Sequence, residues 1–187
     1  MRPTRVGLLR ARLRRHAGRM SQPSRPRLLP AFLTLSAAAL IGVAVHEGYR
    51  EAAYRDPVGI PTVGFGSTVH ADGTTPVQPG DRLPPVRALV TVGAHVGRTE
   101  QVLRQCIGPV PLAQHEWDAY VALAYNIGAN RVCGSTIVRL LHQTPPDYAG
   151  ACRQIGRWVY AGGRRLPGLE ARRAAEMRLC LGEEAAP

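Results

Sequence analysis

Lysine is absent from this 187-residue chain, so all 24 basic residues are arginines, set against 13 acidic residues. Aromatic residues are scarce as well, at 5% of the composition. Nine arginines and no acid fall in residues 1–27, whereas the remaining 160 residues carry 15 arginines and 13 acids. A nucleic-acid groove needs clustered cations on the folded body and aromatic platforms for the bases. The distribution of charge therefore argues against a nucleic-acid partner.

No two cysteines are spaced as Cys-x-x-Cys, which excludes zinc ribbons and thioredoxin-like redox motifs. The four cysteines are Cys106, Cys133, Cys152 and Cys180. In an exported domain an even number of well-spaced cysteines favours two disulfides, and four reduced, buried thiols are the alternative. We predict the sequential pairs 106–133 and 152–180, each of which closes a loop of fewer than thirty residues.

Two further motifs are incomplete. The metalloprotease pattern His-Glu-x-x-His fails twice, because Arg50 and Ala119 stand where its second histidine is required. Gly64 and Gly66 begin a Gly-x-Gly pattern, but Val69 occupies the place of the third glycine in a dinucleotide-binding fingerprint. We therefore expect neither a metal nor a cofactor.

Residues 28–45 contain no charged side chain. As a helix they would measure roughly 27 Å, at the short end of what crosses a bilayer. The preceding arginines predict a cytoplasmic N-terminus and an exported remainder. Because the span includes five alanines together with glycine, serine, threonine and proline, we expect it to be held only weakly in lipid. We interpret it as an uncleaved signal anchor in the bacterial inner membrane, followed by a periplasmic domain.

Alternatives to that anchor remain open. Ala37, Ala38 and Ala39 would suit a signal peptidase, and the span could instead be a buried core helix. Translation could also begin at Met20, since the first nineteen residues look unlike the rest. The expected organisation is a basic arm (1–27), the anchor (28–45) and one folded domain (46–187), which we expect to be monomeric.

The folded domain has the pattern of an α+β protein. Glycine, proline, threonine and valine are concentrated between positions 54 and 68, which predicts short strands joined by turns. Helical periodicity follows, with stops at Gly128 and Gly162-Gly163 and N-caps at Ser135 and Asp147. The predicted helices are Val86–Gln105, Ala113–Ile127, Ser135–His142, Asp147–Tyr160 and Leu169–Leu181.

Two acids and a hydroxyl, Glu47, Asp56 and Thr62, form the strongest candidate for chemistry. Cleavage of a glycosidic bond needs one carboxylic acid to protonate the leaving oxygen and a second carboxylate on the other side of the sugar. Glu47 follows an apolar segment, and desolvation there would favour its protonated form, as a general acid requires. Asp56, on a polar turn, would stay ionised and could share the binding of a water with Thr62. On spacing alone, however, such acids are usually surface charges.

The same residues resemble the phage lysozymes of glycoside hydrolase family 24. Several separated motifs between about positions 47 and 182 agree with that family in order and spacing. They are the Glu47/Asp56/Thr62 spacing ending in Thr-Val-Gly-Phe-Gly, Tyr125-Asn126-Ile127-Gly128, Cys133-Gly134-Ser135-Thr136, Arg157-Trp158-Val159-Tyr160-Ala161-Gly162-Gly163 and Gly168-Leu169-Glu170-Ala171-Arg172-Arg173-Ala174-Ala175-Glu176.

The resemblance implies a lysozyme-like fold with a cleft between a small β lobe and a helical lobe. It implies hydrolysis of the β-1,4 bond between N-acetylmuramic acid and N-acetylglucosamine in peptidoglycan, with lysis of a host cell. Glu47 would be the general acid, and Asp56 and Thr62 would position the attacking water, which predicts inversion. The anchor in front of such a domain resembles the signal-anchor-release endolysins.

Other residues allow two interpretations each. Asn126 could line the cleft or cap a helix, and Ser67 stands where many family members carry a histidine. Trp117 and Trp158 could stack on sugar but fit a core role better. Arg172 and Arg173 could meet anionic wall polymers, but we expect them to be solvated or helix-end charges. The alternative functions are a lytic transglycosylase, which would leave Asp56 and Thr62 without a task, and a non-enzymatic membrane-tethered wall-binding protein.

Overall fold

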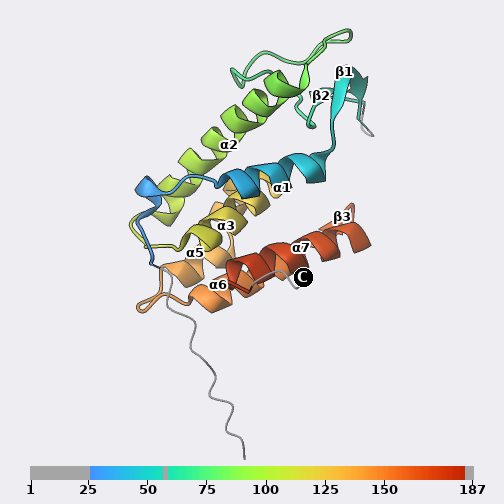
Figure 1. The fold of residues 1–187 in the computed structure, drawn as a ribbon. Helices are drawn as coiled ribbons and strands as arrows, with labels where there is room; N and C mark the ends of the chain where they lie inside the picture. The colour runs from blue at the N-terminus through green and yellow to red at the C-terminus, as the bar shows by residue number, and fades with distance from the viewer. Residues whose placement is uncertain (1–25, 57–58, 184–187) are drawn as a thin grey trace, which may run out of the picture.

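A computed structural model describes residues 26–56 and 59–183 of the chain. A two-stranded β lobe stands at one end of the long helix α2 (Pro85–Ile107), and the other helices form a helical lobe that extends away from the β lobe (Figure 1). The first twenty-five residues, with most of the basic arm and the alternative start at Met20, lie outside the described residues. The α+β class expected from the sequence is confirmed in the part that is described.

The β lobe consists of β1 (Arg50–Arg55) and β2 (Pro61–Gly64), which pair antiparallel with Tyr54 opposite Thr62. A second, very short hairpin joins β3 (Tyr160–Ala161) to β4 (Arg164–Arg165). The described helices are η1 (Pro30–Phe32), α1 (Ala37–Glu47), α2 (Pro85–Ile107), α3 (Gln114–Ile127), α4 (Ala129–Cys133), α5 (Thr136–Leu141), α6 (Tyr148–Gln154), η2 (Ile155–Arg157) and α7 (Pro167–Cys180).

Several helix boundaries are set by capping residues that can be recognised in the sequence. The Ser135 hydroxyl accepts a hydrogen bond from the Ile137 amide, and the Asp147 carboxylate accepts one from the Gly150 amide, so both predicted N-caps are confirmed. Helix α3 ends at Gly128, whose φ of 97° is open to glycine and strained for other residues. That predicted stop is confirmed too.

Two predictions about helices are wrong. The helix expected over Asp147–Tyr160 ends at Gln154 and continues only as the 3₁₀ turn η2. Gly162 and Gly163, expected as a helix stop, instead form the turn of the β3–β4 hairpin with φ of 55° and 74°. The paired positive φ values are those of a tight hairpin turn, which two glycines supply without strain. The five-residue helix α4 was not expected at all.

The core is organised around α3. Helix α2 buries residues at helical spacing, among them Val92, Val96, Leu103 and Ile107, and so presents one apolar face. Helix α3 is buried on nearly all sides, with Trp117 and Tyr120 both at 0% exposure. Burying one large apolar side chain stabilises a fold by about 1.5–3 kcal/mol, so α3 is the main source of cohesion. The core role expected for Trp117 is confirmed.

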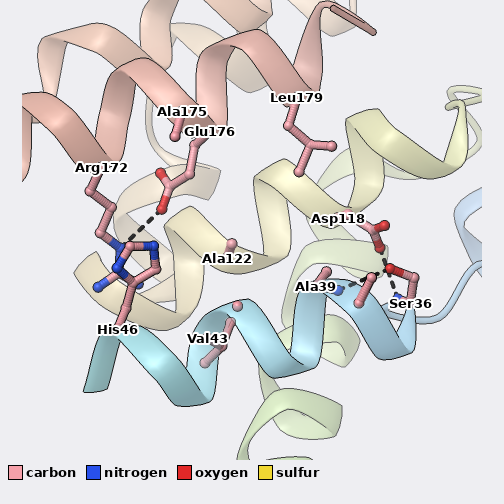
Figure 2. Close-up of a pocket in the computed structure, with 12 residues that line it drawn as sticks. Ser36, Ala39, Val43, His46, Asp118, Ala122, Arg172, Ala175, Glu176 and Leu179 are labelled. Atoms are coloured by element: carbon pink, nitrogen blue, oxygen red, sulfur yellow. Dashed lines mark hydrogen bonds and ion pairs between the residues drawn. The ribbon is translucent and has the colours of Figure 1, made fainter. Parts of the chain in front are cut away.

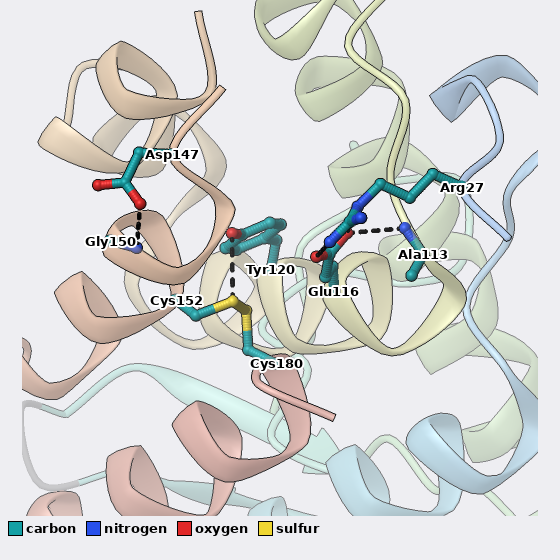
Figure 3. The surroundings of a disulfide bond; sticks show 8 residues. All are labelled: Arg27, Ala113, Glu116, Tyr120, Asp147, Gly150, Cys152 and Cys180. Carbon is teal, nitrogen blue, oxygen red and sulfur yellow. Dashed lines mark hydrogen bonds and ion pairs between the residues drawn. A yellow bond between two sulfur atoms is a disulfide. The ribbon is translucent and has the colours of Figure 1, made fainter. Parts of the chain in front are cut away.

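Both predicted cysteine pairs are joined in the structure. Cys106 on α2 bonds to Cys133 at the end of α4, and Cys152 on α6 bonds to Cys180 at the end of α7. Figure 3 shows the second bridge beside the Tyr120 ring, whose hydroxyl lies 3.6 Å from the Cys152 sulfur. In the chain-entropy model each bridge adds about 3 kcal/mol by restricting the unfolded chain.

Residues 28–45 are not one continuous helix in the structure. Only the helix η1 and the first nine residues of α1 are helical, and the residues between them are extended. Leu33 and Val43 are each 2% exposed and belong to the protein core. Among the residues described, no helix is both long and apolar enough to cross a membrane. The division of the chain into arm, anchor and domain stays a prediction.

The ten residues before α1, which we call the N-terminal strap (residues 27–36), are fixed to the helical lobe by hydrogen bonds. Leu28 and Leu112 exchange two backbone hydrogen bonds of 2.8 Å. The Leu35 amide donates to Glu100 over 2.6 Å, and the Ser36 amide donates to Asp118 over 2.9 Å. Figure 2 shows the second contact at the start of α1. These contacts place α1, and therefore its last residue, on the surface of α3.

Candidate active site

Glu47 is the last residue of α1 and points into the gap between the two lobes. The helix stops there because Gly48 adopts a φ of 69°, which a side-chain-bearing residue would resist. The Glu47 side chain is 25% exposed, so it is accessible from the solvent. The segment that precedes the β lobe thus delivers a carboxyl group to the junction of the two lobes.

A pocket of about 300 Å³ opens at this junction. The β lobe contributes the turn that follows β2, and the helical lobe contributes α2 and the end of α3. The described residues that line the pocket are Glu47, Phe65, Gly66, Ser67, Thr68, Val69, His95, Thr99, Tyr125 and Asn126. Of the predicted site residues, Glu47 and Asn126 share this pocket, and the expectation that Asn126 lines a cleft agrees with its position.

The two oxygens of Glu47 face different surroundings. Oε1 accepts a hydrogen bond from Arg172 Nη1 over 3.3 Å. Oε2 faces Gly66. A Cβ added at position 66 would stand 3.4 Å from Oε2, and the backbone φ of 76° there is one that residues with a side chain rarely adopt. The close approach of the turn to Glu47 therefore depends on glycine at position 66. We expected apolar surroundings for Glu47. That expectation is wrong for Oε1, because the Arg172 guanidinium contacts it.

Asp56 and Thr62 lie together on the β hairpin, outside the residues that line the pocket. Both are organised around Ile60: its amide donates to Asp56 Oδ1 over 2.8 Å, and its carbonyl accepts from the Thr62 hydroxyl over 3.0 Å. Thr62 is 3% exposed and Asp56 is half-buried. The hairpin therefore holds a carboxylate just after β1 and a hydroxyl on β2, which agrees with the turn and strand positions expected from the sequence.

Arg172 and Arg173 are buried, which contradicts the expectation of solvated charges. Arg173 is 0% exposed and Arg172 is 9% exposed. Both contact Glu176, one turn further along α7: its Oε1 accepts from Arg172 Nε over 3.0 Å, and its Oε2 lies 3.1 Å from Arg173 Nη1. Arg173 Nη2 also donates to Asn126 Oδ1 over 2.8 Å. Arg172, Arg173 and Glu176 thus form a buried charged network on α7, which Arg173 links to the exposed Asn126 in the pocket wall.

Burial dominates the electrostatics of this network. It raises the pKa of Glu176, against the opposing effect of the two arginines, and it lowers the pKa of Arg173. On the neighbouring elements, burial and then the charge of Arg172 lower the pKa of His46, and burial raises the pKa of Tyr125 to about 12. His46 and Tyr125 are therefore neutral near pH 7, and the charges beside Glu47 come from α7.

The motifs found in the sequence include all of these residues, but the sequence does not show that Arg172, Arg173 and Glu176 are buried together. The Arg-Arg-x-x-Glu spacing at positions 172–176 places all three side chains within one turn of a helix. Such a spacing is more often a solvated face, and only its burial reveals another role. Trp158, for which we expected a core role, is half-buried and borders a separate pocket between α5 and η2. No cluster of metal-binding side chains occurs in the described part of the chain.

Comparison with known proteins agrees with this geometry. The sequence pattern that defines the phage lysozyme family matches residues 44–176. The SAR-endolysin of bacteriophage PS34 is 30% identical over 135 residues, which cover 72% of this chain and 76% of that protein. The endolysin of Salmonella phage P22 is 30% identical over 130 residues, covering 70% and 86% of the two chains.

Solved structures show the same architecture. The endolysin of Escherichia coli O157:H7 phage FAHEc1 superposes with a TM-score of 0.72 at 29% identity, covering 83% of this chain and 98% of the other. A P22 lysozyme variant superposes with a TM-score of 0.69 at 30% identity, covering 80% and 99%. The match of the family pattern over more than half of the sequence, together with these folds, shows that the chain belongs to the phage lysozyme family.

Proposed function

We propose that the protein is an endolysin of the muramidase type, which hydrolyses the β-1,4 bond between N-acetylmuramic acid and N-acetylglucosamine in peptidoglycan. The observation that carries the proposal is the position of Glu47, a solvent-accessible carboxyl group in the pocket between the two lobes. Membership of the phage lysozyme family supports it independently. The consequence for a bacterial cell is lysis of its wall.

In this proposal Glu47 is the general acid, which protonates the glycosidic oxygen as the bond to the anomeric carbon breaks. Asp56 and Thr62 hold the water that attacks from the opposite face of the sugar, with Asp56 accepting its proton. Such a reaction inverts the anomeric configuration and leaves no covalent intermediate on the enzyme. The shared contact of Asp56 and Thr62 with Ile60 supports their acting as a pair.

We also propose that residues 28–45 serve as a releasable membrane anchor and that the structure corresponds to the released enzyme. The strap is hydrogen-bonded to the helical lobe, α1 buries Val43 and Ala44, and Glu47 at the end of α1 lines the pocket. If residues 28–45 occupied a bilayer, these contacts would be broken and Glu47 would be held at the membrane surface. The SAR-endolysin relatives support this localisation by their names.

The test is Glu47→Gln, a substitution that removes the proton donor and leaves the side-chain volume almost unchanged. Cleavage of purified peptidoglycan should fall by about 10²–10⁴-fold, the usual contribution of general acid catalysis. Glu51→Gln is the matched control, because Glu51 is exposed on β1 and pairs with Arg82 at the surface. The proposal fails if Glu47→Gln keeps the activity of Glu51→Gln.

A further inference from the structure

The carboxylate of Glu176 is in an unusual position for a charged group. The residue is 7% exposed on α7, and each of its oxygens faces a different arginine. Burying an ion costs several kcal/mol unless partners compensate for the lost hydration. A structural helix could place an apolar residue here at less cost, so the buried charge calls for a functional explanation.

Each arginine also contacts the pocket wall through one further nitrogen. Arg172 reaches from Glu176 to Glu47, and Arg173 reaches from Glu176 to Asn126. Figure 2 shows Arg172 and Glu176 in contact where α7 faces α1, with the Arg172 guanidinium beside the His46 ring. One carboxylate thus orients two cations, and each cation contacts a different residue of the pocket wall.

We propose that Glu176 is a positioning residue for the reaction, one that orients both arginines and offsets the charge that Arg172 brings to Glu47. The inference rests on the proposed role of Glu47 as general acid. A general acid must hold its proton until the leaving oxygen takes it. Arg172 alone, 3.3 Å from Glu47, would favour loss of that proton, and the negative charge of Glu176 opposes this effect.

Among the described side chains near the two arginines, Glu176 is the acid whose charge offsets theirs. With Glu47 protonated, Arg172, Arg173 and Glu176 carry a net charge of +1, and without Glu176 the net charge would be +2. His46 on α1 and Tyr125 on α3 are neutral near pH 7, because burial lowers the pKa of the first and raises the pKa of the second. Asp118, on α3, lines a second pocket between α1 and α7 together with Arg172 and Glu176. It lies at the other end of that pocket, where it accepts hydrogen bonds from Ser36 and Gln114 (Figure 2).

The experiment is the pH dependence of kcat and KM for peptidoglycan cleavage by Glu176→Gln. A glutamine can still accept the hydrogen bond from Arg172 Nε, but it lacks the charge. We expect the alkaline limb of kcat to move to lower pH by about one unit, with kcat at pH 7 reduced about tenfold. Glu176→Asp keeps the charge and should restore most of the lost activity. Glu170→Gln is the control, because Glu170 is a partly exposed acid on the same helix.

A second variant keeps the inference testable if Glu176→Gln alone fails to fold. The double variant Glu176→Gln/Arg172→Gln removes a charge of each sign, so Arg173 alone leaves the same net charge of +1 beside protonated Glu47, and the alkaline limb should return toward its wild-type position. An alkaline limb unmoved in folded Glu176→Gln, or equally displaced in the double variant, overturns the inference. The proposed function fails separately, through an active Glu47→Gln. If Glu47→Gln is inactive and the Glu176→Gln profile is unmoved, only the positioning role is refuted.

Discussion

Arg27 donates two hydrogen bonds to Glu116, over 3.1 and 2.6 Å, although 89 positions separate the two residues. Figure 3 shows the pair beside Ala113, whose amide donates to the same carboxylate, and the Arg27 guanidinium also stacks 3.8 Å above the Tyr148 ring. Arg27 precedes the apolar residues 28–45, and Glu116 follows them. If residues 28–45 are the proposed anchor, the two residues would lie on opposite sides of the membrane in the anchored protein, and the pair could form only after release of the anchor.

The Arg27–Glu116 pair should therefore stabilise the released enzyme. Glu116 is almost fully buried, and Arg27→Met would remove both hydrogen bonds that Arg27 donates to it while keeping the one from the Ala113 amide. We expect the free energy of unfolding to fall by about 1–2 kcal/mol, less than for a fully buried pair because Arg27 is 37% exposed. Urea denaturation of the soluble protein measures this. Arg82→Met, which breaks an exposed pair with Glu51, should change stability by less than about 0.5 kcal/mol.

Membrane release can be tested at positions that the released enzyme does not use. Ala31 and Ala37 are exposed in the structure, so Ala31→Leu/Ala37→Leu should strengthen insertion into lipid without disturbing the docked helix. Collapse of the membrane potential should move the wild-type protein, uncleaved, to the soluble fraction and leave the variant in the membrane. Ala31→Ser/Ala37→Ser should be released more readily. If the mature protein begins at Leu40, a signal peptidase has removed the segment and the switch is refuted.

Stereochemistry tests the role of the β hairpin. If Asp56 and Thr62 hold the attacking water, the first product formed has the inverted, α configuration at the new reducing end. Proton NMR during the first turnovers distinguishes it from the β anomer before mutarotation. Asp56→Asn should lower the rate by about 10²–10⁴-fold without trapping an intermediate. A sugar covalently bound to Asp56 would establish retention instead.

The two disulfides should differ in their accessibility to reductants. Cys152 and Cys180 are each 1% exposed, whereas Cys106 and Cys133 are half-buried. Mild reductant should therefore open the Cys106–Cys133 bridge first, as alkylation followed by mass spectrometry would show. Loss of the Cys152–Cys180 bridge should lower the free energy of unfolding by about 2–4 kcal/mol. Simultaneous opening of both bridges in the native protein would contradict this difference in burial.

Local chemistry explains which parts of the fold could be predicted from the sequence. Ser135 and Asp147 cap helices through their own side chains, and Gly128 ends one through its own backbone, so no distant contact is needed. The hairpin at Gly162-Gly163 was missed because two glycines end a helix as readily as they form a turn. The choice between these outcomes depends on the pairing of Tyr160 with Arg165.

The candidate site was also predicted only in part. Glu47, Asp56 and Thr62 were found from their spacing and from the family resemblance, but the burial of Arg173 could not be predicted from the sequence. The fold buries Arg173 because α7 packs against α3, where Asn126 and Glu176 meet its guanidinium. The packing of residues 28–45 could not be predicted either. Their composition suits a weak membrane span, whereas the residues that hold the strap on the helical lobe, Glu100 and Asp118, lie far along the chain.

The most direct test of the proposed function is mass spectrometry of the fragments that the purified protein releases from peptidoglycan. A muramidase adds one water for each bond cleaved, so the fragments should end in a reducing N-acetylmuramic acid. Glu47→Gln protein should release almost none of them. Fragments ending in the anhydro sugar would show a lytic transglycosylase, and the absence of fragments from folded wild-type protein would show a wall-binding protein. Either result would contradict the proposed roles of Glu47, Asp56 and Thr62 in hydrolysis.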